Sequence, residues 1–309
     1  MRIGVDLGGT KIEAIALGGG GDVLARQRVA TPPSYDRTLD AIARLVLRIE
    51  EEVGERGTVG VGVPGVVVPS TGLVKNANST WLIGQPLERD LARLLERPIR
   101  TMNDANCFAL SEAADGAGAG ASVVFGVILG TGVGGGVVID GRCVVGANLI
   151  AGEWGHNPLP WMTTDEFPGP ACYCGKVGCI ESFLSGPGFE RDHARRSGRD
   201  ERSRDIVTAA SLGDEDASRS VAIYHSRLAR ALASVINLLD PDVIVLGGGM
   251  SNLPGLAGAV TSLLPKHVFS DSVASRRSPL AARPIQTRVV SNAHGDSSGV
   301  RGAAWLWPA

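Results

Sequence analysis

Three cysteines and one histidine place the strongest constraint on how this chain folds. The set consists of Cys172, Cys174, Cys179 and His156. Three thiolates and one imidazole complete the tetrahedral ligand set of a structural zinc ion and leave no position for water. Gly175 and Gly178 permit the sharp turns that return Cys179 to the other sulfurs. We therefore predict a zinc-pinned loop over 152–181; the alternative is three buried free cysteines that lie together by coincidence.

The composition fits a globular protein of the cytoplasm. The 309 residues carry a formal net charge of −2, and 44% of them are hydrophobic. No basic field favours nucleic acid or an anionic membrane, and the uncharged stretch 116–139 is too rich in glycine for a membrane-spanning helix. Only two of the five cysteines, Cys107 and Cys143, lie outside the cluster. That usage indicates reduced thiols and not a disulfide framework.

Alternating strand and helix patterns predict an α/β protein with two lobes. Both halves begin with a strand, a Gly/Thr turn and a second strand, which indicates a weak internal duplication around LGGT (7–10) and LGTG (129–132). We expect a small lobe over 1–116, completed by a C-terminal helix at 296–309, and a large lobe over 117–295.

Helical periodicity is clear at two places, 36–55 and 220–239. The intervening segment 190–219 is rich in Arg, Asp and Glu, and is interpreted as a solvated helical excursion. Asp296 is expected to cap the last helix, which runs to Ala304 and packs on the first lobe.

Three glycine-rich turns are candidate phosphate sites, because backbone N–H groups in such turns form anion nests. One of them matches G-x-G-x-x-G, but a strand follows it, so the dinucleotide interpretation fails. Asp6 is either an ordinary turn aspartate or a carboxylate that holds Mg²⁺, and Lys11 is either a solvated strand residue or a phosphate ligand. The candidate ATP and Mg²⁺ residues are Asp6, Gly8, Gly9, Thr10, Lys11, Gly130, Thr131, Gly132, Gly248 and Gly249.

A second group of polar residues suits a polyol substrate. Asp104 lies where a strand ends and a helix begins, so it is either an N-cap or the general base that deprotonates a sugar hydroxyl. Carboxylates can accept hydrogen bonds from two adjacent hydroxyls. The candidate sugar ligands are Asn78, Asn103, Asp104, Glu153, His156 and Glu181.

These motifs together resemble the ROK family of sugar kinases and repressors, within the actin-like ATPase superfamily. The resemblance covers nearly the whole chain and rests on DLGGTK, GVPG, the Asn103-Asp104 pair, GTGVGGG, GEWGH, CYCGKVGCIE, LGGGM and GDSSGVRGAA. It implies a two-lobed, ribonuclease H-like fold with a duplicated mixed sheet, ATP with Mg²⁺, structural zinc and a homodimer. It further implies that Asp104 is the catalytic base, that Asn103, Glu153, His156 and Glu181 contact the sugar, and that His156 and the three cysteines bind zinc.

Within the family, KNANSTW, HNPLPWM and LDPDVIVLGGGMSN look like bacterial fructokinases that also accept mannose. The resemblance therefore implies transfer of the γ-phosphoryl of ATP to the 6-hydroxyl of D-fructose. One alternative is an N-acetylglucosamine, N-acetylmannosamine or glucose kinase; another is a sugar-sensing repressor that lacks its DNA-binding domain. The loop 157–171 is longer than in typical members and is expected to reshape the sugar pocket.

Overall fold

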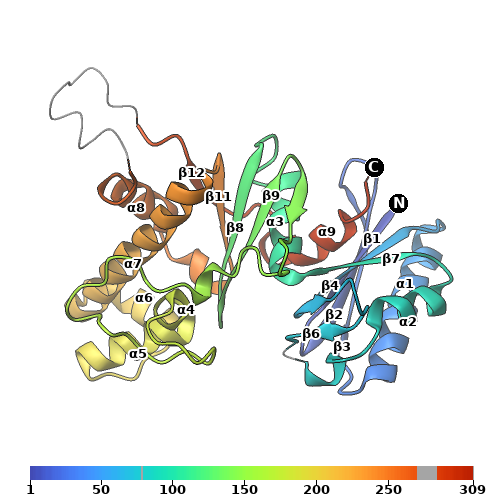
Figure 1. Cartoon of the computed structure of the whole chain (residues 1–309), viewed down its shortest axis with the longest axis horizontal. Coiled ribbons are helices and arrows are strands. Elements are labelled where there is room, and N and C mark those ends of the chain that lie inside the picture. Colours follow the sequence, from blue (N-terminus) through green and yellow to red (C-terminus); the bar gives the residue numbers. More distant parts are fainter. Residues whose placement is uncertain (78, 270–283, 309) are drawn as a thin grey trace. The chain divides into compact units, whose positions relative to one another are not determined.

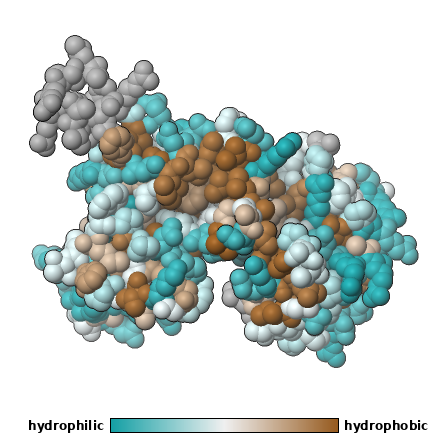
Figure 2. All heavy atoms as spheres, in the orientation of Figure 1, coloured by the Kyte–Doolittle hydropathy of each residue, from teal (hydrophilic) through white to brown (hydrophobic). Residues whose placement is uncertain are grey.

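The computed structural model describes residues 1–77, 79–269 and 284–308, so the candidate Asn78 lies outside the described residues. The chain forms two compact units. The first comprises Met1–Gly120, Gly136–Ala151 and Ala293–Ala309; the second comprises Ala121–Gly135 and Gly152–Asn292. The segment Gly136–Ala151, which was expected in the large lobe, is grouped with the first unit. Figure 1 labels the helices and strands, and Figure 2 colours the same view by hydropathy.

The sheet of the first unit has five strands in the order β3-β2-β1-β4-β7. β2 pairs antiparallel with both β1 and β3, whereas β4 is parallel to both β1 and β7. The carboxyl ends of β1, β4 and β7 therefore meet at one edge. The strands are β1 (Arg2–Leu7), β2 (Lys11–Leu17), β3 (Val23–Ala30), β4 (Thr58–Val63) and β7 (Ile99–Asn103).

Helices cover both faces of this sheet. Side chains on a strand alternate between its two faces, so each strand can pack against helices on both sides. Ile3 and Val5 of β1 join a core that includes Ile42 and Val46 of helix α1, and Gly4, between them, lies against the C-terminal helix. The helices of this unit are α1 (Tyr35–Val53), α2 (Leu87–Leu95), α3 (Asp104–Ala114) and α9 (Ser298–Ala304).

Helix α9 lies so close to the sheet that only glycine fits opposite it. A Cβ on Gly4 would stand 2.0 Å from the carbonyl oxygen of Val300, and one on Gly60 of β4 would stand 1.9 Å from that of Ala303. The packing of a C-terminal helix on the first lobe is therefore confirmed. The prediction that Asp296 caps this helix is wrong, because Gly295–Ser297 form a short 3₁₀ turn and α9 begins after Ser297.

The second sheet repeats the arrangement of the first, in the order β10-β9-β8-β11-β12. Strand β11 is parallel to both β8 and β12, and β10 is antiparallel to β9. The internal duplication expected from the two Gly/Thr turns is thereby confirmed. The strands are β8 (Val123–Leu129), β9 (Val133–Ile139), β10 (Arg142–Val144), β11 (Val243–Gly247) and β12 (Arg288–Ser291); a small hairpin joins β5 (Val66–Val67) to β6 (Val74–Lys75).

Among the described residues, five α-helices belong to the second unit. The longest, α7, begins at Glu215, five residues before the predicted start, because the side chain of Asp214 accepts the N–H of Ala217 as an N-cap. The predicted excursion 190–219 contains most of α5, all of α6 and the start of α7. The helices are α4 (Ile180–Leu184), α5 (Gly186–Ser197), α6 (Ser203–Ser211), α7 (Glu215–Leu239) and α8 (Leu256–Leu263). Within the described ranges, no helix has both the length and the apolar character needed to cross a membrane.

Candidate functional site

Two carboxylates lie at the carboxyl edge of the first sheet. Asp6 is near the end of β1, and Asp104 directly follows β7. Burial raises the pKa of Asp6 to about 6, and the nearby charge of Asp104 contributes to that shift. Burial also raises the pKa of Asp104. Two neighbouring carboxylates that burial makes more basic suit proton transfer or a cation.

Asn103, not Asp104, is the N-cap of α3. The Oδ1 of Asn103 accepts the N–H groups of Ala105 at 2.9 Å and Asn106 at 3.3 Å. Asp104 is the first residue of the helix, and one of its oxygens accepts the N–H of Ala105 at 2.8 Å. The capping interpretation of Asp104 is therefore wrong.

The first glycine turn joins β1 to β2. Gly8 donates its N–H to the carbonyl of Lys11 at 3.0 Å, and the hydroxyl of Thr31 donates to the carbonyl of Gly8 at 2.7 Å. Gly9 and Thr10 are exposed at the tip. The ammonium group of Lys11 lies 3.7 Å from the carboxylate of Glu13. These two hydrogen bonds hold the turn in place, and the ammonium group of Lys11 already has an anionic partner in Glu13.

The four predicted zinc ligands come together in the second unit. Their ligand atoms all lie within 4.8 Å of one another. Cys172 Sγ is 3.7 Å from Nδ1 of His156, and Cys174 Sγ is 3.6 Å from Cys179 Sγ. Zn–S bonds of about 2.3 Å in a tetrahedron place two sulfurs about 3.8 Å apart, so the observed separations fit a zinc ion.

The backbone around the cluster adopts the sharp turns expected. Gly175 and Gly178 both have positive φ, at +86° and +76°, where glycine carries no Cβ penalty. The N–H of Gly175 bonds the carbonyl of Cys172 at 3.0 Å, which closes the first turn. The second ring nitrogen of His156 faces the hydroxyl of Tyr173 at 3.1 Å. That bond fixes the ring with Nδ1 toward the sulfurs.

Glu181 links the cluster to the middle glycine turn. It lies in α4, which begins immediately after Cys179. The Oε2 of Glu181 accepts the N–H of Val133 at 2.9 Å, and a Cβ on Gly132 would stand 2.7 Å from that oxygen. The absence of a side chain at Gly132 therefore lets the carboxylate of Glu181 come this close to the turn. Glu153 precedes the 3₁₀ turn Trp154–His156, and its side chain is exposed.

A cavity of about 810 Å³ lies in the second unit, within the size range of small-molecule sites. Two of the predicted phosphate turns line it, through Gly130, Thr131 and Gly249. Gly248 beside it has φ +83°, and a Cβ there would stand 2.4 Å from the carbonyl of Leu129. Two of the three glycine-rich turns, the middle and the late one, thus lie around one cavity.

Further lining residues of this cavity come from 190–219, which was interpreted as a solvated helical excursion. Glu190, Arg202 and Ser203 line it, and the carboxylate of Glu190 accepts both the N–H and the hydroxyl of Ser203 at 2.9 Å. Charge-rich composition predicted the helices but not this role. No motif in 190–219 could have identified these residues.

The candidate residues divide between the units. Asp6, Asn103 and Asp104 belong to the first unit, whereas the candidates from Gly130 to Gly132, the zinc ligands, Glu153, Glu181 and Gly248–Gly249 belong to the second.

Comparisons with known proteins agree over the whole chain. The sequence profile of the ROK family matches residues 2–309. An N-acetyl-D-glucosamine kinase of Escherichia coli O139:H28 is 40% identical over an alignment of 311 positions, which covers 99% of this chain and 99% of that protein. Among solved structures, a ROK hexokinase from Thermus thermophilus has a TM-score of 0.83 at 32% identity, over 98% of this chain and 96% of its own. A ROK family glucokinase from Streptomyces griseus, in complex with glucose and AMPPNP, has a TM-score of 0.75 at 29% identity over 99% and 98%.

Proposed function

This chain belongs to the ROK family and is an ATP-dependent sugar kinase with the actin-like ATPase fold of that family, and we propose that its sugar substrate is N-acetyl-D-glucosamine. The observation that supports this choice is the 40% identity to an N-acetyl-D-glucosamine kinase over 99% of both chains. The expectation of D-fructose has no such support, and the alternative of an acetylated hexosamine replaces it.

In the proposed reaction, the γ-phosphoryl group of ATP passes to the 6-hydroxyl of the sugar. Asp104 takes the proton of that hydroxyl as its oxygen attacks phosphorus. Burial supports this role, because a base whose pKa is raised toward neutrality accepts a proton more readily. Asn103 holds the start of α3 through its two cap bonds and so fixes the carboxylate of Asp104.

Nucleotide binding is assigned to the cavity of about 810 Å³ and to the glycine turns that line it. Glycines let backbone N–H groups approach phosphate oxygens. Asp6 would hold Mg²⁺, which neutralises negative charge on the phosphates when bound. A carboxylate whose neighbour is a second carboxylate fits a cation. Gly8, Gly9 and Thr10 would offer their backbone N–H groups to phosphate, and Lys11 remains a proposed ligand that would first leave Glu13.

Zinc is assigned a structural role at His156, Cys172, Cys174 and Cys179. All four ligands come from the protein, so no coordination position is left for a reacting water. The metal would fix the start of α4 and with it Glu181. Glu181 and Glu153 are the proposed acceptors for sugar hydroxyls, with His156 as a metal ligand beside them.

A comparison of acceptor sugars tests the proposal directly. Initial rates with ATP and Mg²⁺ are measured for N-acetylglucosamine, N-acetylmannosamine, glucose, mannose and fructose. We expect kcat/KM for N-acetylglucosamine to exceed that for each other sugar by at least about tenfold, which corresponds to about 1.4 kcal/mol in the transition state. A higher kcat/KM for fructose would restore the first expectation and end this proposal.

A further inference from the structure

A second cavity of the second unit has a volume of about 410 Å³ and is separate in its lining from the nucleotide cavity. Its walls come from the loop before Cys172, from α4, from α5 and from α7. The loop residues belong to 157–171, the segment that was expected to reshape the sugar pocket. The structure instead places this segment, from Asp165 to Pro170, on the wall of the second cavity.

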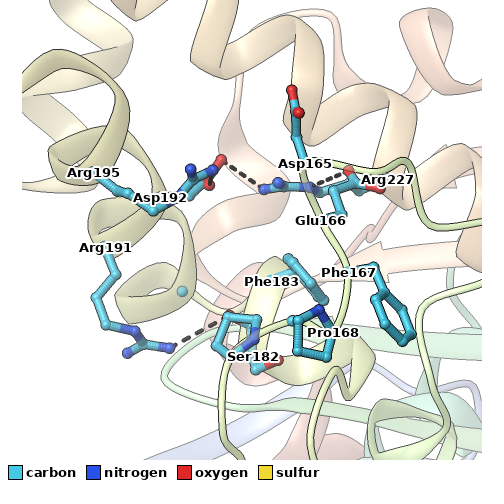
Figure 3. Close-up of a pocket in the computed structure, with 13 residues that line it drawn as sticks. Asp165, Glu166, Phe167, Pro168, Ser182, Phe183, Arg191, Asp192, Arg195 and Arg227 are labelled. Carbon is cyan, nitrogen blue, oxygen red and sulfur yellow. Dashed lines mark hydrogen bonds and ion pairs between the residues drawn. The ribbon is translucent and has the colours of Figure 1, made fainter.

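The wall combines apolar surface with guanidinium groups. Figure 3 shows Arg191 of α5 on one side of the cavity and Phe167 and Pro168 of the loop on the opposite side. Phe183 of α4 contributes its ring, and the guanidinium of Arg227 lies 4.8 Å from the centre of that ring. The lining thus brings guanidinium, carboxylate and apolar groups together.

The buried ion pairs behind the wall do not neutralise it. Arg227 bonds Glu166 at 2.9 Å and Asp192 at 2.7 Å, and Arg230 bonds Glu166 at 2.7 Å. The arginines keep both carboxylates ionised, and the pKa of Glu166 falls to about 2. The cavity and the groups paired behind it hold five arginines and three acidic residues, which leaves an excess of two positive charges: Arg191, Arg195, Arg196, Arg227, Arg230, Asp165, Glu166 and Asp192.

Two guanidinium groups on this wall still offer donors. Arg191 makes one long bond, 3.4 Å, to the carbonyl of Ser182, and forms no ion pair with any acidic group in the part of the chain that the structure describes. Arg227 is 2% exposed, and its Nη2 has no hydrogen-bond acceptor among the described residues. A buried donor without an acceptor costs about 1–3 kcal/mol, which an entering anion would recover.

From this arrangement we propose that the cavity between α4, α5 and the 165–170 loop is a binding site for a small organic anion with one acidic head and an apolar body. The acidic head pairs with Arg191, and the apolar body lies against Phe167, Pro168 and Phe183. Carboxylates and phosphate esters share this chemistry, because both accept two parallel N–H bonds from a guanidinium. The inference does not depend on which sugar the kinase phosphorylates.

The experiment uses fluorinated probes on the whole protein. Binding of 4-fluorobenzoate and of 4-fluorophenyl phosphate is followed by ¹⁹F NMR, with Mg²⁺ and AMPPNP at saturating concentration so that the nucleotide cavity is filled. We expect saturable binding of at least one of them, one molecule per chain, with a Kd of about 1 mM. The neutral analogue 4-fluorobenzyl alcohol is expected to bind at least about tenfold more weakly.

Substitutions locate the binding event. Arg191→Gln is expected to weaken binding at least about tenfold, and Phe167→Ser on the opposite wall several-fold; both side chains are largely exposed, so the fold tolerates the changes. Arg219→Gln, an exposed arginine of α7 outside the cavity, is the matched control and should change nothing. Non-saturable binding up to about 20 mM, equal binding of the alcohol, or unchanged affinity in Arg191→Gln would each overturn the proposal.

Discussion

Val133 donates its backbone N–H to Oε2 of Glu181 at 2.9 Å, so the middle glycine turn and the helix that follows the last cysteine are held by one bond. A carboxylate has two oxygens. We propose that the one that does not serve the turn accepts a sugar hydroxyl.

Replacing Glu181 with Gln tests that second role. An amide oxygen can still accept the N–H of Val133, so the turn keeps its anchor. A hydrogen bond to a charged group contributes about 1.5–3 kcal/mol, so KM for the sugar should rise at least about tenfold while KM for ATP changes little. Glu215→Gln, an exposed carboxylate on α7, is the control. An unchanged sugar KM would remove Glu181 from the proposed sugar ligands.

The proposed base is tested with Asp104→Asn. Turnover should fall at least about a hundredfold, because an amide cannot accept the proton. The melting temperature at neutral pH should not fall, because burial makes the charge of Asp104 unfavourable in the folded protein. Asp36→Asn, on the exposed first turn of α1, serves as the matched variant. Turnover within tenfold of the original protein would mean that another group is the base.

The nucleotide cavity is tested by filling it. Gly249 lines the cavity, a Cβ there would meet nothing within 4 Å, and its φ is not in the left-handed region. Gly249→Leu should therefore fold normally and raise KM for ATP at least about tenfold, since the side chain occupies space that the nucleotide needs. Gly258→Leu is the control, because that site is equally open but lies away from the cavity on α8. An ATP KM that stays constant in Gly249→Leu would move the nucleotide elsewhere.

The proposed zinc site is tested by measuring the zinc content of the protein and by removing the metal. The purified protein should carry one zinc per chain by elemental analysis. Chelation, or Cys174→Ser, should increase hydrogen exchange over 152–181 and raise KM for the sugar before KM for ATP, since the cluster fixes the start of α4. Cys143→Ser, in the first unit, should change neither quantity. Protein that is fully active without stoichiometric zinc would refute the assignment.

Stability should depend on pH through Glu166. Its pKa is about 2 in the folded protein against an ordinary value of 4.5, because Arg230 and Arg227 bond the carboxylate. The stabilisation, about 3 kcal/mol, is fully present above pH 4.5 and is lost as the pH falls toward 2. Urea unfolding should therefore show that Glu166→Gln costs about 3–5 kcal/mol at pH 7 and clearly less at pH 3. Asp165→Asn, an exposed neighbour, should show no such difference between the two pH values. An equal loss for Glu166→Gln at both pH values would contradict the ion-pair explanation.

Local patterns predicted most of the elements. The helical period over 36–55 became α1, which ends at Gly54 because that residue takes the left-handed conformation at φ 77°. The clustering of His156 with the three cysteines was predictable, because these residue types at this spacing are typical of a structural zinc site. Long-range bonds were not predictable. Glu112 of α3 accepts the N–H groups of Ala293 and His294 and the hydroxyl of Ser298. These bonds hold the chain just before α9 and at the first residue of that helix, whereas the sequence had predicted that Asp296 caps it.

Within the site, motifs identified the chemistry but not every role. Asn103 and Asp104 are both residue types that cap helices, so only the backbone could show that Asn103 does so. Arg202 and Ser203 gave no signal, since a charged segment does not reveal which side chains face a cavity. The motifs that the chain shares with its family also do not distinguish one hexose from another, so the sequence motifs alone could not fix the proposed sugar.

The close seating of α9 on Gly4 and Gly60 bears on how the protein is made. β1 is translated long before α9, yet the face of the first sheet that carries these glycines is covered by that helix. A nascent chain that has not reached residue 293 leaves this face open to water and to other chains. The first unit consequently cannot finish folding until α9 has been translated.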